Sequence, residues 1–135
     1  MARIIKIDHV ALVVDNAQKS LAFWRDTLGL KLTAVREEPA EATRVAFLPV
    51  GESQVELLEP TLADSGIARY LVKRGPGMHH LCLEVDDLEE MLLDMKNKGV
   101  RLITEQPRTA PDGRRYAFIH PEATGGVLLE LYESL

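Results

Sequence analysis

Two histidines, His9 and His80, are the first candidates for chemistry in this sequence. Each lies in an apolar segment that alternates as a strand does, and alternation places every second side chain on one face. On these faces His9 is followed by Ala11, and His80 is followed by Cys82. Such small neighbours leave room beside each imidazole, which favours a pocket over a packed core.

Two glutamates, Glu56 and Glu130, each lie between apolar residues near the end of a strand-like segment. A carboxylate buried in such a segment is costly unless a positive group meets it, although exposure on an edge strand is the alternative. Two neutral imidazoles with one or two carboxylates suit a divalent transition metal, and such a ligand set leaves open positions for Lewis-acid catalysis.

An internal repeat relates the two histidines and the two glutamates. Three pairs of segments match in order: residues 9–15 with 80–86, residues 44–48 with 115–119, and residues 55–59 with 129–133. His9 therefore corresponds to His80, and Glu56 corresponds to Glu130. Two copies related by approximate two-fold symmetry would bring the four side chains into one cavity, so the repeat makes the metal hypothesis more specific than the residue types alone.

Each copy predicts a strand, a helix and three further strands. The first strand is expected over residues 4–14, and the later ones over residues 30–36, 43–50, 53–59, 100–105, 115–120 and 126–132. Asp15 or Asn16 is expected to cap the first helix, and Asp86 with Glu89 resembles a capping box for the second. Glycines, Gly29 and Gly99, should end both helices.

A short helix over Ser65–Arg74, closed by Gly75, is expected to link the two halves. We therefore expect a single domain over residues 1–135, with a first module over about 1–60, a linker helix over about 61–77 and a second module over about 78–135.

Composition places the chain among soluble, single-domain proteins. Its 135 residues are 46% hydrophobic and 27% charged, which is ordinary for a globular protein. The single cysteine excludes an internal disulfide framework, and the net charge of −5 argues against a nucleic-acid partner. Apolar runs are too short for a membrane helix, and the N-terminus lacks the apolar stretch of a secretory signal. We expect a cytoplasmic protein.

Other titratable residues have ordinary explanations. His79 should face away from His80, and His120 fits a turn or a pocket rim. Two basic groups fit either anion binding or solvated surface: Arg69, Lys73 and Arg74, and Arg108, Arg114 and Arg115. No Gly-rich phosphate loop, nucleophile elbow or His-Glu-x-x-His motif is present.

The chain resembles the vicinal-oxygen-chelate superfamily and, more narrowly, the methylmalonyl-CoA epimerase family over its full length. The motifs that carry the resemblance are Ile7-Asp8-His9-Val10-Ala11, Val55-Glu56-Leu57-Leu58-Glu59-Pro60, residues 65–71, Gly77-Met78-His79-His80-Leu81, His120-Pro121 and Gly125-Gly126-Val127-Leu128-Leu129-Glu130. The resemblance implies an α+β fold in which two tandem βαβββ modules form a curved mixed sheet around a metal-binding cavity. It implies the metal ligands His9, Glu56, His80 and Glu130.

The resemblance further implies interconversion of (2R)- and (2S)-methylmalonyl-CoA. One divalent metal ion per chain would chelate the thioester carbonyl and the free carboxylate, and would stabilise the enolate left when C2 loses its proton. Cobalt is the expected ion, with zinc, nickel or manganese as alternatives. Glu130 is the expected catalytic acid/base. Some relatives place a second glutamate where this chain has Val45, so Glu37, Glu38, Glu41 or a bound water is expected to serve instead.

Three alternative functions share this scaffold: a glyoxalase-type lactoylglutathione lyase, a metal-dependent transferase or dioxygenase, and a non-catalytic protein that sequesters a small drug. The last would not need ligands at all four positions, yet all four are present. Family members commonly form dimers, so we expect a homodimer, with Phe23 and Trp24 on the first helix as one possible contact surface.

Overall fold

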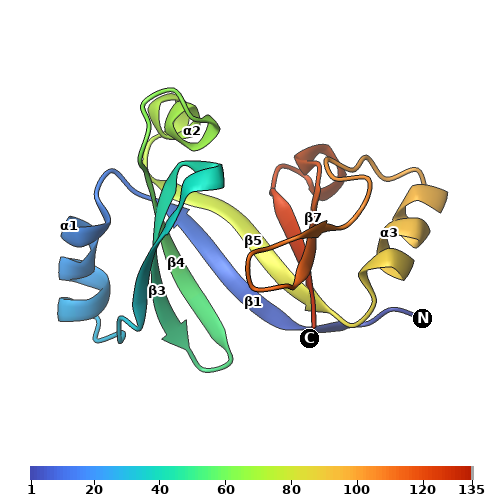
Figure 1. Cartoon of the computed structure of the whole chain (residues 1–135), viewed down its shortest axis with the longest axis horizontal. Coiled ribbons are helices and arrows are strands. Elements are labelled where there is room, and N and C mark those ends of the chain that lie inside the picture. The colour runs from blue at the N-terminus through green and yellow to red at the C-terminus, as the bar shows by residue number, and fades with distance from the viewer. Residues whose placement is uncertain (135) are drawn as a thin grey trace. The chain divides into compact units, whose positions relative to one another are not determined.

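The structure, a computed structural model, describes residues 1–134 and divides into two compact units. The first unit contains Met1–His9 together with the residues from His80 onward, and the second contains Val10–His79. The first strand, β1 (Ile4–Val13), contributes to both. Each unit contains strands packed by a helix (Figure 1), so the expected α+β class is confirmed.

The second unit has the strand order β2–β3–β4–β1. Its strands β2 (Ala34–Glu38), β3 (Thr43–Val50) and β4 (Ser53–Pro60) pair antiparallel. Helix α1 (Ala17–Leu21) continues into a π-helical segment, Ala22–Thr27, and packs on β3 and β4. The core under α1 is made of small and branched apolar side chains: Val14, Ala17, Leu21, Ala46, Leu48 and Leu57.

The first unit has the strand order β1–β5–β8–β7–β6. Its strands are β5 (Gly77–Val85), β6 (Arg108–Thr109), β7 (Arg115–Ile119) and β8 (Leu129–Glu133). Strand β5 pairs parallel with β8, whereas β7 pairs antiparallel with both β8 and β6. Helix α3 (Leu88–Asn97) packs on β7 and β8 (Figure 1) over an apolar core: Val85, Leu88, Leu92, Ala117, Ile119 and Leu131.

The helix starts agree with the sequence except at one position. Asn16 caps α1, and Ser65 caps α2 (Gly66–Arg74), each through a side-chain oxygen that accepts a backbone N–H. For α3 the cap is Asp87 and not Asp86, because Asp87 accepts the N–H of Glu90. The Asp86 carboxylate is used elsewhere, since it accepts the backbone N–H of Arg3 at 2.7 Å.

One Arg–Glu arrangement occurs once in each unit, at positions that the repeat matches. Glu59 accepts the N–H of Ala17, the first residue of α1, at 2.8 Å and pairs with Arg44 at 3.1 Å. Glu133 accepts the N–H of Leu88, the first residue of α3, at 2.8 Å and pairs with Arg115 at 2.9 Å. We call each arrangement a helix clamp. It satisfies an N–H that the helix itself leaves unpaired.

Three expected strands begin later or are shorter than the sequence indicates. The expected strand over residues 100–105 is reduced to a single bridge between Leu102 and Ile119. The segment bends there because the N–H groups of Ile103 and Thr104 both bond to the carbonyl of Phe118. Strand β8 starts only at Leu129, after Gly125 and Gly126 with φ of 78° and 115°, and β2 starts only at Ala34.

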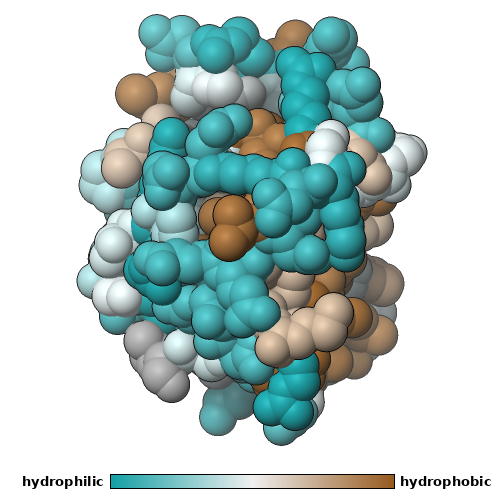
Figure 2. Space-filling view, turned by 90° about the vertical axis from the view of Figure 1, so that its right-hand side faces the viewer, coloured by the Kyte–Doolittle hydropathy of each residue, from teal (hydrophilic) through white to brown (hydrophobic). Residues whose placement is uncertain are grey.

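The outer face of the first unit, where α3 lies, is mostly hydrophilic (Figure 2). Among the described residues, no helix is both long and apolar enough to cross a membrane.

Candidate metal centre

Three of the four predicted ligands meet in the first unit. The Nε2 atoms of His9 on β1 and His80 on β5 lie 3.1 Å apart, and the Oε1 atom of Glu130 on β8 lies 3.2 Å from the first and 3.1 Å from the second. All three side chains are buried, with exposed fractions of 3%, 8% and 6%.

Strand register explains why these side chains share a face. Glu130 lies opposite Cys82, so it projects on the same side as Cys82 and His80, two residues earlier on β5. Its neighbours Leu129 and Leu131 project the other way and pack beneath α3. The apolar residues around Glu130 therefore position its carboxylate by filling the core on the opposite face.

The three donor atoms fit one divalent cation. His9 Nδ1 lies 2.8 Å from Oδ2 of Asp8, and because a carboxylate can only accept, Nδ1 keeps a proton there and Nε2 is the nitrogen that would present a lone pair to a cation held with His80 and Glu130. Two ligand atoms about 2.1 Å from a shared ion at right angles are about 3 Å apart. The observed separations match this, and the set of two imidazoles and one carboxylate suits a first-row transition metal.

Glu130 is ionised at neutral pH. Burial raises the pKa of its carboxyl, but hydrogen bonds and positive charge from His80 and His9 outweigh burial and hold the pKa below its usual range. The carboxylate is therefore ready both to bind a cation and to accept a proton.

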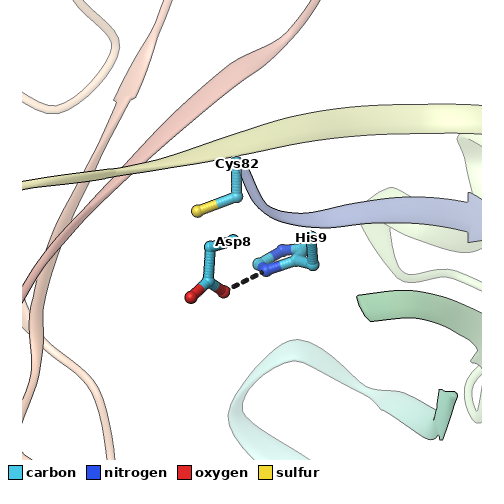
Figure 3. A group of neighbouring side chains, drawn as sticks. All are labelled: Asp8, His9 and Cys82. Atoms are coloured by element: carbon cyan, nitrogen blue, oxygen red, sulfur yellow. Dashed lines mark hydrogen bonds and ion pairs between the residues drawn. The ribbon is translucent and has the colours of Figure 1, made fainter. Parts of the chain in front are cut away.

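Asp8 belongs to the site, although strict alternation along β1 would place it opposite His9. Figure 3 shows its carboxylate directed at the His9 ring. The Arg114 guanidinium lies 3.3 Å from Asp8 and 3.0 Å from Glu84, and its Cζ lies 4.5 Å from the centre of the Tyr132 ring. Burial raises the pKa of Asp8, but His9 and Arg114 together hold it below its usual range. Sequence reasoning missed Asp8, and it left Arg114 in a loop cluster of uncertain role.

Cys82 lies beside Asp8 and His9 (Figure 3), and one potential ligand atom from each lies within 4.8 Å of the others. Burial raises the pKa of its thiol to about 12. The thiol therefore stays protonated at neutral pH, and only the thiolate is a good metal ligand.

Glu56 lies on β4 of the second unit and is half-buried. Its register partner on β3 is Phe47. Val45, where the resemblance led us to expect a glutamate in some relatives, is buried against Ala11 and Leu58 and offers no acid or base.

The three alternative bases differ in position. Glu37 bonds to Arg44 at 2.7 Å, on the face of β2 turned toward the helix clamp. Glu38 lies opposite Thr43, on the other face, and is half-buried. Glu41 lies in the exposed 3₁₀ turn Pro39–Glu41. Of these three, Glu38 lies on the face that Val45 and Glu56 share.

Most of the remaining sequence candidates have structural partners. The His79 ring contacts Tyr70 with centroids 4.7 Å apart, and His120 accepts the N–H of Glu122 as the cap of the 3₁₀ helix Pro121–Thr124. Arg74 lies over the Tyr70 ring, and Arg108 is exposed on β6.

Comparison with known proteins gives a consistent result. Residues 8–118 match the model of the glyoxalase/bleomycin resistance protein/dioxygenase superfamily. The mitochondrial methylmalonyl-CoA epimerase of Mus musculus is 35% identical over 96% of this chain and 73% of its own. The crystal structure of methylmalonyl-CoA epimerase from Mycobacterium tuberculosis has a TM-score of 0.88 and 35% identity over 98% of this chain and 89% of its own.

A methylmalonyl-CoA epimerase solved with methylmalonyl-CoA and NH4+ has a TM-score of 0.88 and 32% identity over 98% of this chain and 96% of its own. These matches extend over nearly the whole chain and agree with one another in family. The chain belongs to the glyoxalase/bleomycin resistance protein/dioxygenase superfamily and, within it, to the methylmalonyl-CoA epimerase family.

Proposed function

We propose that this protein is a metal-dependent epimerase that interconverts (2R)- and (2S)-methylmalonyl-CoA through an enolate. The observation that carries the proposal is the buried triangle of His9, His80 and Glu130, whose donor atoms lie 3.1–3.2 Å apart in a chain of the epimerase family. A relative of 32% identity was solved with methylmalonyl-CoA bound, which supports an acyl-CoA thioester as the substrate.

His9, His80 and Glu130 would hold one divalent ion, whose positive charge would stabilise the negative charge that develops on the thioester oxygen. Glu130 would accept the proton from C2 on one face of the substrate. Cys82, with no exposed surface, closes the protein side of the site against water. We propose cobalt as the ion, with zinc, nickel or manganese as alternatives because nitrogen and oxygen donors accept all four.

Glu56 is proposed as a fourth ligand, bound directly or through water. It projects from β4 on the face of the second unit that carries Ala11, and strand alternation places Ala11 on the same side of β1 as His9. Glu38 is proposed as the second acid or base, because of the three alternatives it is half-buried and on that face.

We further propose one catalytic domain that includes both modules, acting in the cytoplasm as a homodimer. Phe23 is the exposed member of the pair Phe23 and Trp24, since Trp24 packs against the core of the second unit.

The direct test compares two substrates with the purified, cobalt-loaded protein: methylmalonyl-CoA and the hemithioacetal of methylglyoxal and glutathione. We expect turnover of methylmalonyl-CoA only. Turnover of the hemithioacetal alone would replace the proposal with a glyoxalase-type function, and turnover of neither would favour a non-catalytic binding protein.

A further inference from the structure

Arg114 contacts several groups of the first unit through a single, largely buried side chain. Its Nη1 and Nη2 atoms donate to Oδ1 of Asp8 at 3.3 and 3.4 Å, Nη2 also donates to Glu84 at 3.0 Å, and Nε donates to the carbonyl of Glu133 at 3.3 Å. The face of the guanidinium lies over Tyr132. A planar guanidinium bonded at its edges and packed on its face has little freedom to move, so it can fix the carboxylate that it holds.

The internal repeat distinguishes contacts that the fold requires, which should occur in both copies, from contacts that serve the metal site, which should occur in one. The helix clamp is present in both units, as Arg44 with Glu59 and as Arg115 with Glu133. Among the described residues, 1–134, a set of contacts like that of Arg114 occurs once. The positions that the repeat matches to Asp8, Glu84 and Arg114 are His79, Val13 and Thr43.

These matched residues do not reproduce the charge network. His79 contacts the Tyr70 ring, Val13 is buried, and the Thr43 hydroxyl donates to the carbonyl of Glu41. A network that the fold requires would be expected in both copies, as the clamp is. Because the charge network around Arg114 lies beside His9 and its counterpart is missing at the matched positions, we relate the network to the metal ligand His9.

We propose that Arg114 is a positioning residue for the metal centre: it fixes the Asp8 carboxylate, which orients the His9 ring so that Nε2 faces His80 and Glu130. This inference rests on the metal site of the proposed function and not on the substrate. Without Arg114, the carboxylates of Asp8 and Glu84 would face each other with no cation between them. Asp8 would then move away from His9, and the ring would lose the contact that sets its orientation.

Whether removal of Arg114 weakens or strengthens metal binding distinguishes a positioning role from a purely electrostatic one. Removing a positive side chain close to a divalent cation would strengthen binding if only the Coulomb interaction mattered. Positioning predicts the opposite. Loss of a group that orients a histidine ligand typically weakens metal binding ~10–100-fold.

The test is the Co2+ affinity of the purified apoprotein, measured by competition with a chelator, together with the visible absorption spectrum of bound Co2+. We expect R114M to bind Co2+ ~10–100-fold more weakly than the unmodified chain. R114K should recover part of the lost Co2+ affinity, because lysine keeps the positive charge but lacks the several N–H donors of the planar guanidinium. The double variant R114M/D8N should bind no more weakly than D8N, since both changes break one chain of contacts.

Arg115 provides a matched control, because it is the adjacent arginine and belongs to the helix clamp. R115M should lower the melting temperature while leaving Co2+ affinity within twofold of the unmodified chain. Unchanged or tighter Co2+ binding in R114M, or equal weakening in R114M and R115M, would overturn the inference. Failure of the unmodified chain to bind Co2+ would overturn the metal site itself, whatever the variants do, and turnover of methylmalonyl-CoA would then be tested separately.

Discussion

Glu130→Gln separates the two roles proposed for Glu130. The amide keeps an oxygen where Oε1 now lies, 3.2 and 3.1 Å from the two histidine nitrogens, but it cannot take up a proton. The variant should therefore retain most of its bound metal and lose most of its epimerase activity.

The position of Glu130 beside the cation site sets the expected loss of epimerisation rate in Glu130→Gln. Removing a general base typically costs ~10²–10⁴-fold in rate, which is about 3–5 kcal/mol of transition-state stabilisation. Glu130 would also bind the cation together with His9 and His80, and a carboxylate bound to a cation is a weaker base than a free glutamate. We accordingly expect a rate loss toward the lower end, about 10²-fold.

The assay follows epimerisation of (2S)-methylmalonyl-CoA by NMR, with metal content measured on the same sample. Glu133→Gln is the matched control, since it makes the same change on the same strand but at the helix clamp. It should epimerise at the unmodified rate below its melting temperature. Near-normal activity of Glu130→Gln with metal bound would show that Glu130 is a ligand only, and the base would then be sought at Glu38 first.

Three further predictions concern stability, metal binding and assembly. Glu133→Ala leaves the N–H of buried Leu88 without its acceptor, so the free energy of unfolding measured by calorimetry should fall by about 1–2 kcal/mol at pH 7. Arg115 and that N–H lower the pKa of Glu133 in the folded state, so Glu133 stabilises the fold above its pKa in the unfolded chain, and this stabilisation should be lost as the pH falls through the lower pKa of the folded state. A stability difference between the variant and the unmodified chain that persists in acid would contradict this. His80→Ala should abolish stoichiometric Co2+ binding in elemental analysis, and unchanged affinity would remove His80 from the ligand set. Sedimentation should give twice the 15.1 kDa monomer mass, and a single monomeric species would rule out the homodimer.

The sequence predicted what depends on periodicity and on the repeat. Alternation placed His80 and Glu130 each opposite the apolar neighbours on its own strand, and the match between His9 and His80 identified the pair that lies 3.1 Å apart. Helical spacing and capping residues predicted the starts of α1 and α2, and they predicted the start of α3 to within one residue.

Contacts that break these regularities were not predictable from the sequence. The Asp8 carboxylate bonds to His9, against the alternation of β1, and Arg114, the residue before β7, bonds to Asp8 across 106 residues of sequence. The bend at Thr104 depends on a buried hydroxyl that accepts the N–H of Phe118, a contact between segments that no local pattern encodes. Long-range polar contacts of this kind are set by tertiary packing, which adjacent residues do not determine.

Proton exchange at C2 tests the central proposal most directly. Methylmalonyl-CoA incubated in deuterated water with the metal-loaded protein should gain deuterium at C2 while it epimerises, and removal of the metal by a chelator should stop both processes together. Epimerisation without deuterium gain, or deuterium gain that continues at full rate after the metal is removed, would contradict a mechanism based on His9, His80 and Glu130.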